Sequence, residues 1–280
     1  MPLLLNRFTD HTINTGEVQI GYSVGPDNGP TLLLCHGVTS RRDGFLRVID
    51  ELIGDYRIIT MDQRGHGFSG HTPGAYDRFD HARDIRFMME NVCEESTVVW
   101  GHSMGGGNSV AMTNDPPANL KALVLEDPAV FGKTHPVRTD SSSTVNTFQV
   151  HLGLIEQGLS VEEMAPHLQA GSPGQPEYFA EWKAECLLQM DADILRGVVS
   201  GTYGGFDDPA ALLAAIKVPV LLLQADPDAG GILPEDHIGG MIPENDTFTM
   251  KKIVGAGHNI NREFPELMLP VVLPWLAEHA

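Results

Sequence analysis

The residues best suited to chemistry lie around Ser103, in the pentapeptide Gly101-His102-Ser103-Met104-Gly105. This G-x-S-x-G pattern directly follows the apolar run TVVW and opens a helical segment. A sharp turn from strand to helix exposes the serine hydroxyl, and small residues flank it because the crowded backbone needs unusual dihedral angles. The hydroxyl would lie at a helix N-terminus, whose partial positive charge favours a developing oxyanion. The pattern therefore predicts Ser103 as a nucleophile.

A nucleophilic serine needs a base, because its hydroxyl is a weak nucleophile at neutral pH. His258 stands in the segment GAGHN, just after the last apolar run of the chain. We therefore predict His258 as the general base.

Two backbone amides are candidates for an oxyanion hole. His36-Gly37-Val38 ends an earlier apolar run, TLLLC. The N–H of Val38 could join the N–H of Met104 in stabilising the negative charge of a tetrahedral intermediate. The alternative is that this segment is a simple turn at the end of a strand.

Short apolar runs alternate with longer amphipathic segments over most of the chain. The apolar runs cover residues 18–24, 31–35, 56–61, 97–100, 122–125, 218–223 and 247–253. The helical candidates cover residues 43–52, 77–91, 104–113 and 265–278. This alternation predicts an α/β fold whose mostly parallel central sheet is flanked by helices, with 18–24 as an edge strand. Function gathers at the carboxyl ends of strands in such sheets, where the motifs above begin.

Residues 130–210 break the alternation, because they contain no strong strand signal. The helical segments predicted there are separated by Gly- and Pro-rich stretches, and they cover residues 144–157, 161–168, 177–190 and 193–199. We predict a helical cap over residues 130–210, inserted after the strand at 122–125, which is counted here as strand six. Residues 1–129 and 211–280 would then form the α/β core.

Four motifs together resemble those of the α/β-hydrolase superfamily: HG at 36–37, DQRGHGFS at 62–69, GHSMGG at 101–106 and GAGH at 255–258. The likeness covers nearly the whole chain outside the cap. It implies the α/β-hydrolase fold and the chain order serine, acid, histidine. Epoxide hydrolases and dehalogenases of the superfamily carry aspartate at the nucleophile position, so the resemblance disfavours those activities. It leaves the substrate open, since one fold hosts many chemistries.

The acid that would orient the imidazole has more than one candidate. The superfamily places it after strand six or after strand seven. Asp127 follows strand six, 24 residues beyond Ser103, as in haloalkane dehalogenases and zearalenone-lactonase-like hydrolases. Asp226 and Asp228 follow strand seven, in a loop that departs from the usual family pattern. The resemblance favours Asp127, with Asp226 as the main alternative and Asp228 or Glu126 as further candidates.

These residues predict a serine hydrolase that cleaves a carboxylic ester or lactone through an acyl-enzyme, without a metal or organic cofactor. Apolar side chains of the cap favour a small hydrophobic substrate. The residues predicted to bind it are Phe131, Phe148, Tyr178 and Trp182. Arg41 and Arg42 could instead hold a substrate carboxylate, or they could form a solvated charge pair.

Three other functions fit the same residues. They are a cofactor-free perhydrolase or haloperoxidase, a hydrolase of carbon–carbon bonds in diketones, and a ligand receptor that retains the triad. Peroxide-dependent bromination, a substrate panel and single-turnover modification of Ser103 would distinguish them.

The composition of the chain indicates which classes of binding partner and which cellular compartment to expect. A formal net charge of −19 over 280 residues argues against binding to nucleic acid or to an anionic membrane surface. The three cysteines show no CxxC spacing, which predicts reduced thiols and a cytoplasmic protein. We find no signal-peptide pattern or apolar run of membrane-spanning length in the sequence. The oligomeric state stays open.

Overall fold

The computed structural model describes residues 7–93, 96–133, 143–172, 175–243 and 245–280. Within these ranges, eight strands form one sheet in the order β1-β2-β4-β3-β5-β6-β7-β8. The strands are β1 (Thr9–Asn14), β2 (Gln19–Val24), β3 (Thr31–Cys35), β4 (Arg57–Met61), β5 (Thr97–His102), β6 (Leu120–Glu126), β7 (Val220–Ala225) and β8 (Phe248–Ile253). The pairs β1–β2 and β2–β4 are antiparallel, and all others are parallel. The predicted α/β fold with a mostly parallel sheet is confirmed.

The prediction of an edge strand at 18–24 is wrong. That run forms β2, which lies between β1 and β4, and β1 is the true edge. The sequence of β1, TDHTIN, is mostly polar, and five of its six residues are exposed. A strand that buries so little apolar surface leaves no alternating hydrophobic signal in the sequence.

Helices cover both faces of the sheet. One hydrophobic cluster packs α2 (Arg78–Asn91), α3 (Met104–Met112) and α8 (Pro209–Ala215) against one face. A second cluster packs α1 (Leu46–Leu52), α10 (Ile260–Glu263) and α11 (Pro265–His279) against the other. Successive residues of β3 alternate between the two clusters, which explains why its sequence, TLLLC, is apolar throughout.

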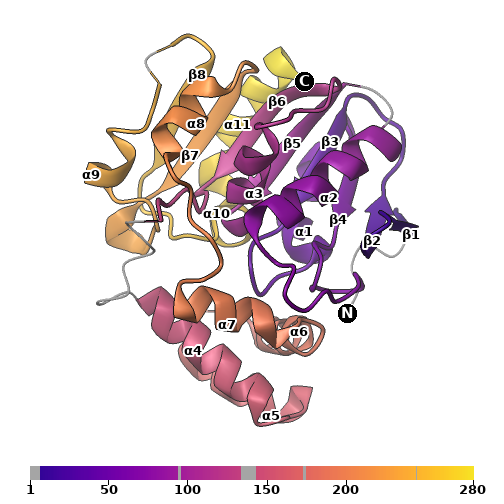
Figure 1. Ribbon diagram of the computed structural model, residues 1–280, viewed down its shortest axis with the longest axis vertical. Coiled ribbons are helices and arrows are strands. Elements are labelled where there is room, and N and C mark those ends of the chain that lie inside the picture. The colour runs from indigo at the N-terminus through magenta and orange to yellow at the C-terminus, as the bar shows by residue number, and fades with distance from the viewer. Residues whose placement is uncertain (1–6, 94–95, 134–142, 173–174, 244) are drawn as a thin grey trace.

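Between β6 and β7, four of the helices in the described ranges form a separate group beyond the sheet (Figure 1). They are α4 (Ser143–Glu156), α5 (Val161–Gly171), α6 (Glu177–Leu188) and α7 (Ala192–Ser200). Their apolar side chains pack mainly on one another in a third cluster. The predicted cap includes residues 134–142 and 173–174, which lie outside the described residues, and its boundaries at 130 and 210 stay a prediction.

Short elements complete the chain: two 3₁₀ turns, η1 (Arg42–Phe45) and η2 (Pro227–Ala229), and the helix α9 (Glu235–Ile238). No helix in the described ranges is long and apolar enough to span a bilayer. The thiols of Cys35, Cys93 and Cys186 are buried and unpaired.

Candidate active site

Ser103 occupies a sharp turn between β5 and α3, with φ 53° and ψ −116°. A positive φ is strained for a residue with a Cβ, and such strain persists only where surrounding packing imposes it. Here the packing depends on glycines. A Cβ at Gly101 would lie 2.5 Å from the carbonyl O of Gly105, and a Cβ at Gly105 would lie 2.2 Å from that of Cys35. Without side chains at these positions, α3 approaches β3 and β5 closely and holds Ser103 at the end of β5.

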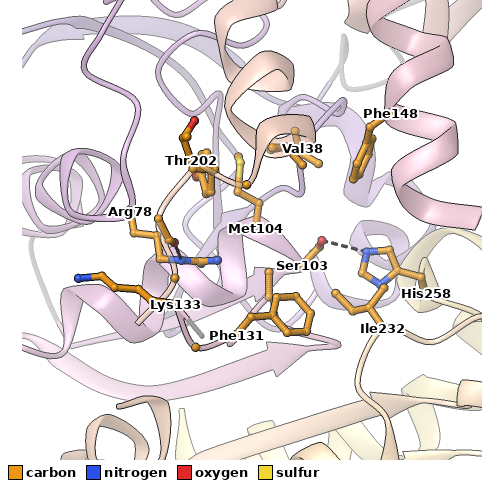
Figure 2. A pocket seen from close by; sticks show the side chains of 17 residues that line it. Val38, Arg78, Ser103, Met104, Phe131, Lys133, Phe148, Thr202, Ile232 and His258 are labelled. Carbon is orange, nitrogen blue, oxygen red and sulfur yellow. Dashed lines mark hydrogen bonds between the residues drawn. The ribbon is translucent and has the colours of Figure 1, made fainter. Parts of the chain in front are cut away.

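The structure brings Ser103, His258 and Asp127 into one hydrogen-bonded chain. Nε2 of His258 lies 2.9 Å from Oγ of Ser103, as the dashed line in Figure 2 marks. Nδ1 of His258 lies 2.7 Å from Oδ2 of Asp127. Ser103 lies in the turn after β5, His258 in the loop before α10 and Asp127 directly after β6. The carboxyl ends of the parallel strands therefore bring the three residues together.

The carboxylate of Asp127 is buried and held from two further sides. The amide of Ile232 donates to Oδ2 at 2.9 Å, and the amide of Ala225 donates to Oδ1 at 3.2 Å. Its backbone is also strained, with φ 38°. These contacts fix the carboxylate against the imidazole of His258, which is the geometry that orients a general base.

The other candidate acids have different partners. Oδ2 of Asp226 accepts from the amide of Gly255 at 2.9 Å, and Oδ1 accepts from the amide of Asp228 at 3.2 Å. The hydrogen bond from Gly255 lowers the pKa of Asp226, and Lys252 lies 3.4 Å away. Asp226 therefore organises the loop around η2, and Asp228 is exposed. The structure brings neither of them to the imidazole.

Glu126 is fully buried beside the same assembly. Its carboxylate accepts from Nε1 of Trp100 at 3.1 Å and from the amide and Nδ2 of Asn261 at 2.8 and 3.0 Å. Asn261 lies in α10, three residues beyond His258. Glu126 thus ties the loop that carries the imidazole to the sheet. Burial raises the pKa of this carboxyl from its ordinary 4.5 to about 7.

This raised pKa predicts a pH dependence of stability. The folded carboxyl binds its proton more tightly than the unfolded one, so folding loses free energy as the pH rises from 4.5 toward 7. We expect the wild type to lose stability relative to Glu126→Gln over that interval, by up to ~1.4 kcal/mol per pH unit. Urea unfolding of both proteins across the interval measures the difference. Parallel pH profiles would contradict it.

An apolar cavity of about 300 Å³ opens at Ser103 and His258. Figure 2 shows Phe131 and Phe148 among its lining side chains, as predicted for substrate-binding residues. Val38 and Met104, the predicted oxyanion residues, line the same cavity. The structure therefore brings these four residues together around the serine.

The structure does not bring Tyr178 and Trp182, predicted to bind substrate, to Ser103, because neither lines the two cavities beside it. Tyr178 is 65% exposed, and Nε1 of Trp182 donates to Asp43 at 2.7 Å. The helix α6 instead turns Phe179 and Lys183 toward the site. These two residues are one helical turn apart and share a face, a rotation that sequence reasoning missed.

The second cavity, of about 390 Å³, is more polar and shares Val38, Ser103, Phe148 and His258 with the first. Four of its basic residues were not predicted from the sequence: His151, His167, Lys183 and Arg262. They come from four different helices, α4, α5, α6 and α10, so no local sequence motif contains them.

Arg41 fits neither interpretation offered for it. It is buried rather than solvated. Its Nε donates to both carboxylate oxygens of Asp43 at 3.0 Å, and Nη2 and Nη1 donate to Glu185 and Gln189 at 2.8 and 2.9 Å. These contacts join α6 to the segment before α1, and they leave Arg41 outside both cavities.

Sequence analysis also missed Arg78, a buried arginine in the wall of the apolar cavity (Figure 2). Its Nε donates to the carbonyl O of Gly204 at 2.7 Å, and its guanidinium lies over the rings of Tyr203 and Phe206. Burial lowers its pKa. As for metals, no group of three or more His, Cys, Asp or Glu residues in the described ranges could hold one.

Comparisons with known proteins identify the fold family. The alpha/beta hydrolase fold family matches residues 30–185. The 2-(acetamidomethylene)succinate hydrolase of Mesorhizobium japonicum is 32% identical over 279 residues, 95% of each chain. The monoacylglycerol lipase of Mycolicibacterium smegmatis is 26% identical over 94% of this chain and 95% of its own. The structure of an N-formylmaleamic acid deformylase from Pseudomonas putida S16 superposes with a TM-score of 0.78 at 22% identity, over 94% of this chain and 100% of that chain. The chain therefore belongs to the α/β-hydrolase fold family.

Proposed function

We propose that this protein is a serine hydrolase that cleaves a carboxylic ester or lactone through an acyl-enzyme. The observation that carries the proposal is the hydrogen-bonded chain from Ser103 through His258 to Asp127, which faces a cavity able to hold an acyl group. The relatives named above as a hydrolase and a lipase support acyl-group hydrolysis.

The reaction follows from the positions of the three side chains. Oγ of Ser103 attacks the carbonyl carbon while Nε2 of His258 takes its proton. The imidazolium then protonates the leaving alkoxide, and the alcohol departs. Water, deprotonated by the same imidazole, attacks the acyl-enzyme and releases the acid. Asp127 accepts a hydrogen bond from the N–H at Nδ1. This bond keeps Nε2 free to act as the base, and it stabilises the imidazolium.

The backbone amides of Val38 and Met104 would stabilise the oxyanion. Both residues line the apolar cavity beside Ser103, and Met104 is the first residue of α3. The unpaired amides at a helix N-terminus carry partial positive charge, which stabilises an alkoxide more than a neutral carbonyl.

The apolar cavity supports a hydrophobic portion of the substrate. Phe131 and Phe148 contribute aromatic surface, and Val198 and Ile232 contribute aliphatic surface. We propose that the segment 130–210 acts as a cap, since Phe148 and Val198 of that segment meet core residues in this cavity.

A panel of nitrophenyl esters and lactones of rising acyl length tests the function. We expect steady turnover that depends on acyl length, together with stoichiometric labelling of Ser103 by a fluorophosphonate. Labelling without turnover would support the receptor, and bromination that requires peroxide would support the perhydrolase. Cleavage of diketones in preference to esters would support carbon–carbon hydrolysis. Failure of the fluorophosphonate to label Ser103 would reject a serine mechanism.

A further inference from the structure

We propose that the polar cavity beside Ser103 binds a carboxylate group of the substrate through Lys183 and Arg262. The inference rests on the proposed function, since Ser103 would cleave the same molecule. It names the substrate class as an ester or lactone that carries a free carboxylate, such as a half-ester of a dicarboxylic acid.

Among the described residues, Lys183 is a buried cation without a carboxylate partner. The residue is 8% exposed, and its ammonium donates to the carbonyl O and Oγ1 of Thr39 at 2.6 and 3.2 Å. These bonds use two of its three donors. In the described part of the chain, Lys183 forms no ion pair with a carboxylate. One donor therefore remains for a group in the cavity that Lys183 lines.

Arg262 lines the same cavity with most of its hydrogen-bonding capacity unused. Its Nε is buried and has no hydrogen-bond partner in the part of the chain that the structure describes, and its Nη2 lies 3.7 Å from the carboxylate of Glu263. The guanidinium lies over the rings of Phe179 and Trp182, at 4.9 and 5.4 Å from their centroids. Stacking on these rings fixes its plane and leaves its edge to bind a planar carboxylate.

The electrostatics of the cavity favour an anion. Burial and the charge of Arg262 lower the pKa of Lys183 to about 7. Burial likewise lowers the pKa of Arg262. A buried cation beside a second, partly buried one is costly, and a bound carboxylate would offset both the desolvation and the repulsion. His151, whose Nδ1 is buried without a partner, adds a further hydrogen-bonding group to the same wall.

The arrangement of the two cavities places the carboxylate relative to the reacting bond. Both cavities include Ser103 and His258, and Val38 and Phe148 also belong to both. A carbonyl at Ser103 can therefore extend its hydrophobic part into the apolar cavity and its charged part toward Lys183. The hydrogen bond from Lys183 to the carbonyl O of Thr39 also connects this cavity to the proposed oxyanion hole, because Thr39 directly follows Val38, whose amide we propose as one of its donors.

Arg78 is the competing site for a carboxylate, and the structure favours it less. It is one cation in an apolar wall, covered by the rings of Tyr203 and Phe206. Its Nη1 is buried without a hydrogen-bond partner among the described residues, but it packs against α3, where a Cβ at Gly107 would lie 2.1 Å away. The polar cavity instead offers two cations and an unpaired imidazole.

A matched pair of esters tests the proposal: mono-4-nitrophenyl glutarate, which carries a carboxylate, and neutral 4-nitrophenyl pentanoate. We expect the wild type to prefer the glutarate in kcat/KM. In Arg262→Gln that preference should fall by about 10- to 100-fold, mainly through KM for the glutarate, because charge-assisted hydrogen bonds are lost. Arg262→Lys should retain part of it. Arg196→Gln, which removes an exposed cap arginine paired with Glu156 and Asp193, should keep the wild-type preference.

Two outcomes would overturn the carboxylate site. One is a wild type that does not prefer the glutarate. The other is loss of the preference in Arg78→Gln with its retention in Arg262→Gln. Calorimetric titration of Ser103→Ala with monomethyl glutarate separates this question from the proposed function. Binding there that Arg262→Gln abolishes would support the site even if no ester were hydrolysed, and absence of binding would reject it.

Discussion

Replacing Ser103 with alanine should reduce turnover of nitrophenyl esters by ~10⁶-fold, as expected when the nucleophile of a triad is removed. Oγ is the atom that His258 contacts at 2.9 Å, and alanine offers no other group to attack the carbonyl. The remaining cavity can still bind substrate, so the loss should appear in kcat. Steady-state assays of the purified variant, together with fluorophosphonate labelling, measure the loss of turnover.

The fold should survive this substitution. Alanine keeps the Cβ, so the strained turn at φ 53° is neither relieved nor made worse. Ser109→Ala is the matched control. Oγ of Ser109, in the same helix α3, donates to the carbonyl O of Gly105 at 2.7 Å and lines neither cavity beside the site. It should lose some stability and retain turnover. Undiminished hydrolysis by Ser103→Ala would reject the nucleophile.

The sequence predicted the central strands well because their environment imposes a simple pattern. A strand with helices on both faces is apolar at nearly every position, as β3 shows with all five residues buried. β1 buries almost nothing, so it left no signal. The same rule explains why the prediction placed the edge of the sheet one strand too far inward.

The candidate site was predictable where one short motif carries both position and chemistry. The turn at Ser103 requires glycines that the sequence displays, and His258 follows the last strand. The acid was ambiguous because β6 and β7 are neighbours, and each is followed by an aspartate. Only the coordinates distinguish them: Asp127 contacts the imidazole, and Asp226 contacts Gly255 and Asp228.

The walls of the cavities were harder to predict, for a different reason. Lys183 and Arg262 come from α6 and α10, which are far apart in the sequence. Which side of α6 faces the serine depends on how the helix is rotated in its packing. An amphipathic pattern does not fix that rotation when aromatic residues occur on both sides, as Tyr178 and Phe179 do.

Replacing Asp127 with asparagine should lower turnover by about 10³- to 10⁴-fold, if the carboxylate orients the imidazole as in other triads. Oδ2 accepts from both His258 and the amide of Ile232, and Oδ1 accepts from the amide of Ala225. The side chain of asparagine has one acceptor oxygen and one NH₂ group, which can only donate. If its oxygen serves the backbone, its NH₂ faces Nδ1 and favours the tautomer whose Nε2 carries the proton. Such an imidazole cannot accept the proton of Ser103.

Asp226→Asn is the matched control, because it removes the same charge after the neighbouring strand. Its partners are the amides of Gly255 and Asp228 and the ammonium of Lys252, none of which touches the imidazole. We therefore expect turnover close to that of the wild type, with a modest loss of thermal stability around η2. Measuring kcat for both variants in parallel shows which of the two aspartates is the acid of the triad. Near-normal turnover in Asp127→Asn, together with a large loss in Asp226→Asn, would transfer the acid to the loop after β7 and require the loops to rearrange when substrate binds.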